Sequence, residues 1–173
     1  MRIQPTDLPV ADSLPAVAAA LNEHGAAVLV AAPGAGKTTF LKYLTVRLAL
    51  GDGATLGMEG HLPVLVPLSA YANALEQHDV ALQDFVTDYF RDRGIDVPAG
   101  EVIKEALNAG RALVMLDGLD EVQALKQRTL VVERVETFFD HHCKKGNKFL
   151  VTSRIVGYRD VRLSVDGLKE CTL

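Results

Sequence analysis

The segment Ala31-Ala32-Pro33-Gly34-Ala35-Gly36-Lys37-Thr38-Thr39 decides the fold of this chain. It follows an apolar run at 27–31 and precedes a run of helical period that starts at Phe40. A glycine-rich loop between a strand and a helix is the setting of a phosphate-binding loop. Gly34 and Gly36 allow successive backbone N–H groups to point inward, and the helix N-terminus adds partial positive charge. The segment therefore predicts a site for a polyphosphate.

The side chains of this loop have separate expected roles. Lys37 is expected to reach the β and γ phosphates as a point charge, and the Thr38 hydroxyl is expected to ligate Mg²⁺. The predicted phosphate-binding residues are Pro33, Gly34, Ala35, Gly36, Lys37, Thr38 and Thr39.

The rest of the chain predicts an α/β fold. Short apolar runs alternate with longer segments of helical period, a pattern typical of a mainly parallel sheet of about five strands in three layers, with helices on both faces. We expect strands at 27–31, 62–68, 112–117 and 148–153, and a fifth that begins near 168. Because each run is so apolar, we expect none of them to be an edge strand.

Composition excludes several classes of protein. The chain has 173 residues, 49% of them hydrophobic and 23% charged, which suits one globular domain. A formal charge of −4 argues against a dedicated nucleic-acid binder. The longest apolar run, 26–33, is far shorter than the ~20 residues of a membrane span. Only two cysteines, Cys143 and Cys171, favour a reducing, cytoplasmic setting.

Three carboxylates follow the apolar run at 112–117. Asp117 ends that run, at the sheet edge where open parallel sheets bind ligands, so we expect it to meet the Mg²⁺ held by Thr38. Asp120 and Glu121 lie one turn further on, where Asp120 is expected to orient an attacking water. The alternative that Asp120 and Glu121 only favour the start of a helix stays open.

These motifs resemble a known family. The pairing of Ala-Pro-Gly-Ala-Gly-Lys-Thr-Thr (32–39) with Leu-Asp-Gly-Leu-Asp-Glu-Val (116–122) resembles the NACHT domain of the STAND class of P-loop NTPases. This domain is the nucleotide switch of innate-immune, NLR-like receptors and their bacterial relatives. A third segment, 148–154, ends in Thr-Ser-Arg and is similar to the family's sensor, whose arginine, here Arg154, reads the γ-phosphate. The resemblance covers about 25–160 and implies that the sensor strand lies between the other two motif strands.

The resemblance also implies a function and a domain organisation. It implies a Mg²⁺-dependent ATPase that hydrolyses ATP to ADP slowly with Asp120, Glu121 and Arg154. Its nucleotide state is expected to control self-association of the full-length protein in signal transduction and antiviral defence. Residues 1–24 are expected to pack on a nucleotide-binding core at 25–173, with 6–12 against the adenine. Because lid and winged-helix domains follow the core in this family, we expect the chain to be a weakly active fragment that contacts other domains of its polypeptide.

Guanine specificity is not supported, because the nearest match to Asn-Lys-x-Asp, at 147–150, has Leu150 in place of the aspartate. Two other functions stay open. A P-loop small-molecule kinase has about this length, although it must exclude water rather than orient it. A scaffold that holds ADP permanently would serve only in assembly. We expect neither membrane nor direct nucleic-acid partners.

Overall fold

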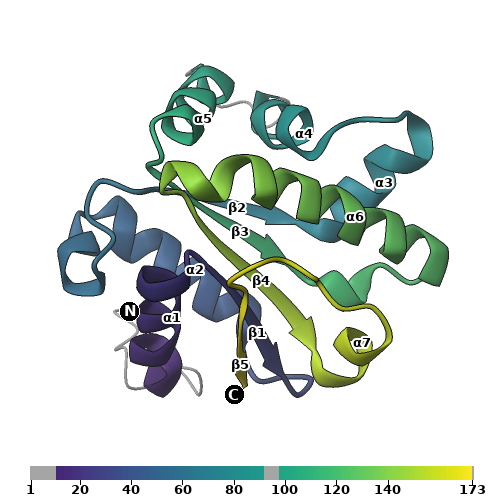
Figure 1. The fold of residues 1–173 in the computed structure, drawn as a ribbon, viewed down its shortest axis with the longest axis horizontal. Helices are drawn as coiled ribbons and strands as arrows, with labels where there is room; N and C mark the ends of the chain where they lie inside the picture. Colours follow the sequence, from purple (N-terminus) through teal and green to yellow (C-terminus); the bar gives the residue numbers. More distant parts are fainter. Residues whose placement is uncertain (1–10, 92–97, 173) are drawn as a thin grey trace.

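A computed structural model of the protein describes residues 11–91 and 98–172. Its centre is a five-stranded sheet with the order β2-β3-β4-β1-β5 (Figure 1). Every pair of neighbouring strands is parallel. The strands are β1 (Ala26–Ala31), β2 (Leu62–Pro67), β3 (Ala112–Asp117), β4 (Lys148–Arg154) and β5 (Lys169–Thr172).

Helices connect these strands and cover both faces of the sheet (Figure 1). They are α1 (Leu14–His24), α2 (Lys37–Ala49), α3 (Leu68–Gln77), α4 (Leu82–Asp88), α5 (Ala99–Asn108), α6 (Leu125–His142) and α7 (Ile155–Asp160). Short 3-10 turns include η3 (Asp52–Leu56), η5 (Leu119–Glu121) and η6 (Cys143–Lys145). Within the described ranges, no helix is both long and apolar enough to cross a membrane.

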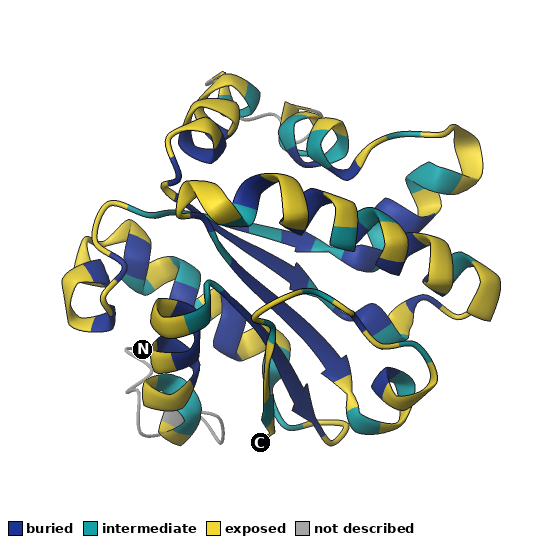
Figure 2. Ribbon diagram, in the orientation of Figure 1, coloured by how far each residue is buried: buried dark blue, intermediate teal, exposed yellow. Residues whose placement is uncertain are grey.

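Two hydrophobic cores lie on opposite faces of the sheet, because successive side chains of a strand point to opposite sides. The core under α1 and α2 contains the strand residues Ala27, Leu29, Leu113, Met115 and Leu150. The core under α3, α4, α5 and α6 contains Val28, Val30, Val64, Val66, Val114, Leu116, Phe149 and Val151. In Figure 2 the central strands are almost entirely coloured as buried, and the helices are buried on part of their surface and exposed on the rest. The predicted three-layer α/β fold is therefore confirmed.

The strand order confirms one expectation and corrects another. β4 lies between β1 and β3, as the family resemblance implies. The prediction that no apolar run forms an edge is wrong, because β2 and β5 are the two edge strands. Helices cover both faces of β2, so its apolar composition reflects burial of its faces and not its place in the sheet. Pro63 and Pro67, which lack an N–H, also suit an edge strand.

Asn147 links several elements at the end of the sheet where β3 and β4 begin. Its buried side chain accepts a hydrogen bond from the Ala112 N–H at 3.0 Å, and donates to the carbonyls of Leu107 at 2.8 Å and His142 at 3.1 Å. These contacts join the start of β3 to the ends of α5 and α6. Asn147 precedes β4, at the end of the sheet away from the glycine-rich loop, so it is a structural residue there.

We predict that Asn147→Ala lowers the free energy of unfolding by about 3 kcal/mol, because it removes a buried hydrogen bond from each of three backbone groups. Urea denaturation followed by circular dichroism measures this loss. Asn108→Ala is the matched control, since Asn108 lies exposed on α5 and its replacement should leave the unfolding midpoint nearly unchanged. Equal destabilisation by both variants would contradict this role of Asn147.

Candidate functional site

Three motif strands end at the same edge of the sheet. β1 leads into the glycine-rich loop, β3 ends at Asp117 and β4 ends at Arg154. Because the strands are parallel, their carboxyl ends meet there. A cavity of about 260 Å³ opens at this point. It is lined by Gly34, Gly36, Lys37, Thr38, Thr39, Asp117, Gly118, Asp120, Glu121 and Arg154.

The glycine-rich loop has the backbone that anion binding requires. Gly34 and Gly36 have φ angles of +77° and +82°, in the left-handed region that favours glycine. A Cβ added at either position would meet nothing within 4 Å, so the space beside the loop is open. Gly36 is also the N-cap residue of α2, so this helix directs its N-terminal N–H groups toward the cavity.

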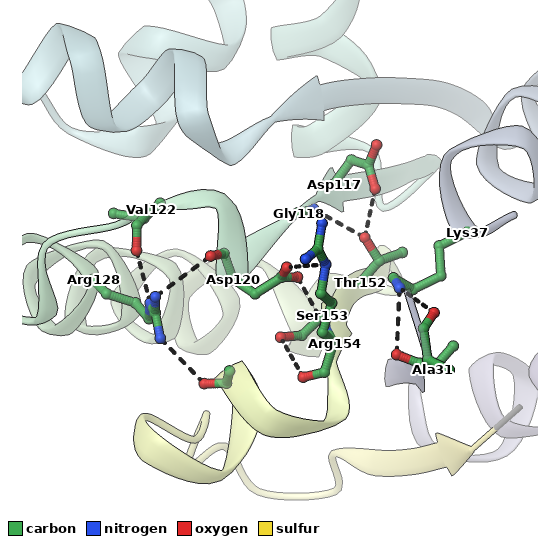
Figure 3. A network of polar contacts seen from close by, with 12 residues as sticks. Ala31, Lys37, Asp117, Gly118, Asp120, Val122, Arg128, Thr152, Ser153 and Arg154 are labelled. Carbon is green, nitrogen blue, oxygen red and sulfur yellow. Dashed lines mark hydrogen bonds and ion pairs between the residues drawn. The ribbon is translucent and has the colours of Figure 1, made fainter. Parts of the chain in front are cut away.

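Lys37 lies at the first position of α2 with its ammonium group against the loop. Its Nζ donates to the carbonyl oxygens of Ala31 at 3.4 Å and Ala32 at 3.3 Å (Figure 3). Two of the seven predicted loop residues, Pro33 and Ala35, do not line the cavity. Pro33 has no N–H to offer, and the Ala35 N–H donates to the Ala32 carbonyl within the loop.

Asp117 connects the loop helix with two strands. Its Oδ2 accepts a hydrogen bond of 2.7 Å from the Thr38 hydroxyl on α2. Its Oδ1 accepts one of 2.5 Å from the Thr152 hydroxyl on β4 (Figure 3). The structure thus brings together Thr38 and Asp117, the two predicted magnesium ligands.

Asp120 and Arg154 form an ion pair at the mouth of the cavity. The Arg154 Nε lies 2.9 Å from Asp120 Oδ2, and the Arg154 backbone N–H donates to Asp120 Oδ1 at 2.8 Å (Figure 3). The Asp120 side chain is only 8% exposed, whereas that of Arg154 is 53% exposed. Both oxygens of Asp120 are therefore engaged by one residue, whose guanidinium group still reaches solvent.

The turn η5, which carries Asp120 and Glu121, is called the acidic turn below. Glu121 is its exposed carboxylate. Partial burial of the carboxyl group raises its pKa above the usual value, and the negative charges of Asp117 and Asp120 raise it further. The cations Arg154 and Lys37 oppose this effect only in part. Glu121 therefore gains a proton more readily than an ordinary carboxylate does, which suits a group that accepts a proton.

The donor set at this site fits Mg²⁺ bound together with a polyphosphate. In the described part of the chain, no three His, Cys, Asp or Glu side chains converge to hold a metal by themselves. Mg²⁺ in phosphate sites takes one or two protein oxygens and completes its shell with phosphate and water. The hydroxyl of Thr38 and the carboxylate of Asp117 supply such oxygens, 2.7 Å apart. Three carboxylates face two cations in the cavity lining, which also favours an added cation.

Three further residues of the site have no role in the sequence prediction. Thr152 donates a hydrogen bond to Asp117. Gly118 has a φ of +77°, and a Cβ added there would lie 2.8 Å from the Glu121 side chain. Buried Arg128 donates to the carbonyls of Asp120, Val122 and Gly157. The hydroxyl of Thr152 within an apolar strand is a signal that sequence reasoning can use once the strand order is known.

Comparison with known proteins agrees with this geometry. The family model of the NACHT domain matches residues 26–172. A search of the curated proteins found no match. The matched range contains all five strands of the sheet and every residue that lines the cavity. The chain therefore belongs to the NACHT family, and it contains a nucleotide-binding module of the STAND class of P-loop NTPases.

Proposed function

We propose that this chain binds ATP with Mg²⁺, hydrolyses it slowly, and acts as a switch whose nucleotide state controls self-assembly. One observation carries the proposal. A single cavity beside the anion-binding loop is lined by Lys37 at the start of α2, Asp117 at the end of β3 and Arg154 at the end of β4. The cavity therefore contains cations that can bind phosphate, oxygen atoms that can bind a metal ion and a carboxylate that can accept a proton from water.

The cavity accommodates the phosphate tail and not the whole nucleotide. Its 260 Å³ is below the ~300–1,000 Å³ of pockets that enclose a drug-sized ligand. In the proposed complex, backbone N–H groups of the loop bind the phosphates, and the Lys37 ammonium group exchanges the carbonyls of Ala31 and Ala32 for phosphate oxygens. Residues 6–10, most of the segment expected against the adenine, lie outside the described residues.

ATP is the favoured nucleotide. The nearest match to a guanine-reading motif, at 147–150, lies at the start of β4, whereas the cavity is at the end of that strand. The Asn147 side chain makes three hydrogen bonds, all to backbone groups of the sheet and of the neighbouring helices. This placement supports the proposal that the chain does not select guanine.

Thr38 and Asp117 would hold Mg²⁺ in the proposed complex. An ion held by these two residues would supply positive charge against the charge that develops on the phosphates during transfer. Lys37 and Arg154 add positive charge from the two sides of the phosphate tail, because they come from α2 and from the end of β4. Electrostatic stabilisation of this kind is the main contribution of protein groups to phosphoryl transfer.

Glu121 is the group that we propose accepts the proton of the attacking water. The water oxygen then bonds to the γ-phosphorus, the bond to the bridging oxygen breaks, and ADP and inorganic phosphate result. Among described residues the Glu121 carboxylate has no hydrogen-bond partner, whereas both oxygens of Asp120 are held by Arg154. We therefore propose that Asp120, the residue first expected to orient water, positions Arg154 instead.

The Asp120–Arg154 pair also supports the switch. The half-exposed Arg154 guanidinium group can be drawn to a γ-phosphate, which ADP lacks, so ATP and ADP favour different partners for it. Arg154 is the N-cap residue of α7, and its backbone N–H binds Asp120. A change of partner at Arg154 would therefore act on the end of β4 and on α7.

We predict that Lys37→Ala weakens ATP binding about 100-fold or more, because it removes charge-assisted hydrogen bonds to two phosphates. Isothermal titration calorimetry with ATP and Mg²⁺ measures the loss. Lys42→Ala is the matched control, since Lys42 is an exposed lysine of the same helix and is absent from the cavity lining. Similar affinities in the wild type and Lys37→Ala would rule out the site.

We predict that Glu121→Gln keeps ATP binding but lowers the rate of phosphate release at least about 100-fold, the usual contribution of a general base. Because the pKa of Glu121 is raised, the wild-type rate should fall with acidification at a higher pH than an ordinary carboxylate would give. Glu133→Gln, on the exposed face of α6, should retain the wild-type rate. Loss of turnover in Asp120→Asn together with a normal rate in Glu121→Gln would instead assign the water to Asp120.

We predict that a non-hydrolysable ATP analogue increases the mass of the chain in light scattering, whereas ADP leaves it unchanged. Arg154→Ala should remove this difference while ADP binding persists, because ADP has no γ-phosphate for Arg154 to bind. Arg159→Ala, an exposed arginine on α7, should behave as the wild type. Equal masses of the wild type with both nucleotides would contradict self-assembly by this chain.

A further inference from the structure

Thr152 is a buried hydroxyl in the middle layer of the protein. It is 0% exposed, and it lies in β4 next to Val151, which faces the core under α6. A hydroxyl buried in this way requires hydrogen-bond partners. Thr152 has them in both directions, since its Oγ1 donates to Asp117 Oδ1 at 2.5 Å and accepts from the Gly118 N–H at 2.9 Å.

The Asp117 carboxylate is consequently held by hydroxyl groups from two sides. Thr38 binds Oδ2 from the side of the phosphate loop. Thr152 binds Oδ1 from the side of the sheet (Figure 3). Thr38 is exposed and is itself a predicted magnesium ligand, so its bond must adapt when the ion binds. Thr152 is enclosed by the sheet, so its bond to a charged acceptor stays in place.

The second hydrogen bond extends this effect to the acidic turn. Gly118 follows Asp117 and adopts a φ of +77°, which turns the chain from β3 into η5. Its N–H is bound by Thr152, so one hydroxyl fixes both the orientation of the carboxylate and the first residue of the turn that carries Glu121.

We propose that Thr152 is a positioning residue for Mg²⁺, which holds Asp117 in the orientation that the ion requires beside a bound triphosphate. This inference rests on the proposed function, because it assigns the metal to the same cavity. Residues that hydrogen-bond to a metal ligand commonly change metal affinity 10- to 100-fold when they are replaced. A residue that only filled space in the sheet would have no such effect.

The test compares Thr152→Val, which has nearly the same shape but no hydroxyl, with Thr152→Ser, which retains the hydroxyl. Binding of a non-hydrolysable ATP analogue is measured by calorimetry, first with EDTA and then over a series of Mg²⁺ concentrations. We expect Thr152→Val to match the wild type in EDTA but to need about 10- to 100-fold more Mg²⁺ for half of the magnesium-dependent gain in affinity. Thr152→Ser should return the requirement to within a few-fold of the wild type.

Thr129→Val is the matched control, since Thr129 is exposed on α6 and its hydroxyl donates to the Leu125 carbonyl of its own helix. It should leave the Mg²⁺ requirement unchanged. If Thr152→Val does not fold, Thr152→Ala, which also lacks the hydroxyl, is compared with Thr152→Ser in the same way.

The outcomes separate this inference from the proposed function. An unchanged Mg²⁺ requirement in a folded variant without the hydroxyl would overturn the role of Thr152 and leave the ATP site intact. A wild-type chain that binds no nucleotide, with or without Mg²⁺, would overturn the proposed function, and the inference would fail with it. A lower melting temperature with a normal Mg²⁺ requirement would make Thr152 a purely structural residue.

Discussion

The position of β4 between β1 and β3 is the constraint on which the site depends. Ala31, the last residue of β1, is paired with Arg154, and Leu116 of β3 is paired with Val151. This register places the end of β4 beside the start of the phosphate loop on one side and beside Asp117 on the other. If β3 lay directly beside β1, neither Thr152 nor Arg154 could stand between the loop and the acidic turn. The strand order therefore supplies contacts that no single motif contains.

Charge balance explains why these groups remain together at the cavity. Asp117, Asp120 and Glu121 repel one another, and each is relieved in a different way. Asp117 is held by two hydroxyls, Asp120 is paired with Arg154, and the pKa of Glu121 is raised. Three carboxylates, at the end of β3 and in η5, thus have three different environments. In the proposed mechanism this difference separates metal binding, arginine positioning and proton transfer, which three equivalent carboxylates could not do.

The sequence predicted the parts of the site whose chemistry is local. Gly36, Lys37 and Thr38 act through the backbone and side chains of one short segment, so the motif alone indicates their arrangement. Helix and strand periodicity also predicted the three layers of the fold. Because periodicity indicates only which faces of an element are buried, it did not indicate that β2 is an edge strand. Thr152 was missed because its hydroxyl depends on a partner 35 residues away, on a neighbouring strand that periodicity does not identify.

Arg128 shows a second kind of contact that sequence reasoning does not reach. It is a buried cation that donates to backbone carbonyls on both sides of it, those of Asp120 and Val122 in and after η5 and that of Gly157 in α7. Every residue has a backbone carbonyl, so the sequence does not indicate which carbonyls a side chain binds. From the sequence alone, such an arginine cannot be distinguished from an ordinary charged residue on a helix surface. In the fold it joins the acidic turn to α7, whose N-cap residue is Arg154. A displacement of either element must disturb the three carbonyl contacts of one buried guanidinium group. The turn and the helix are therefore coupled, and in the proposed switch a change of partner at Arg154 reaches both of them.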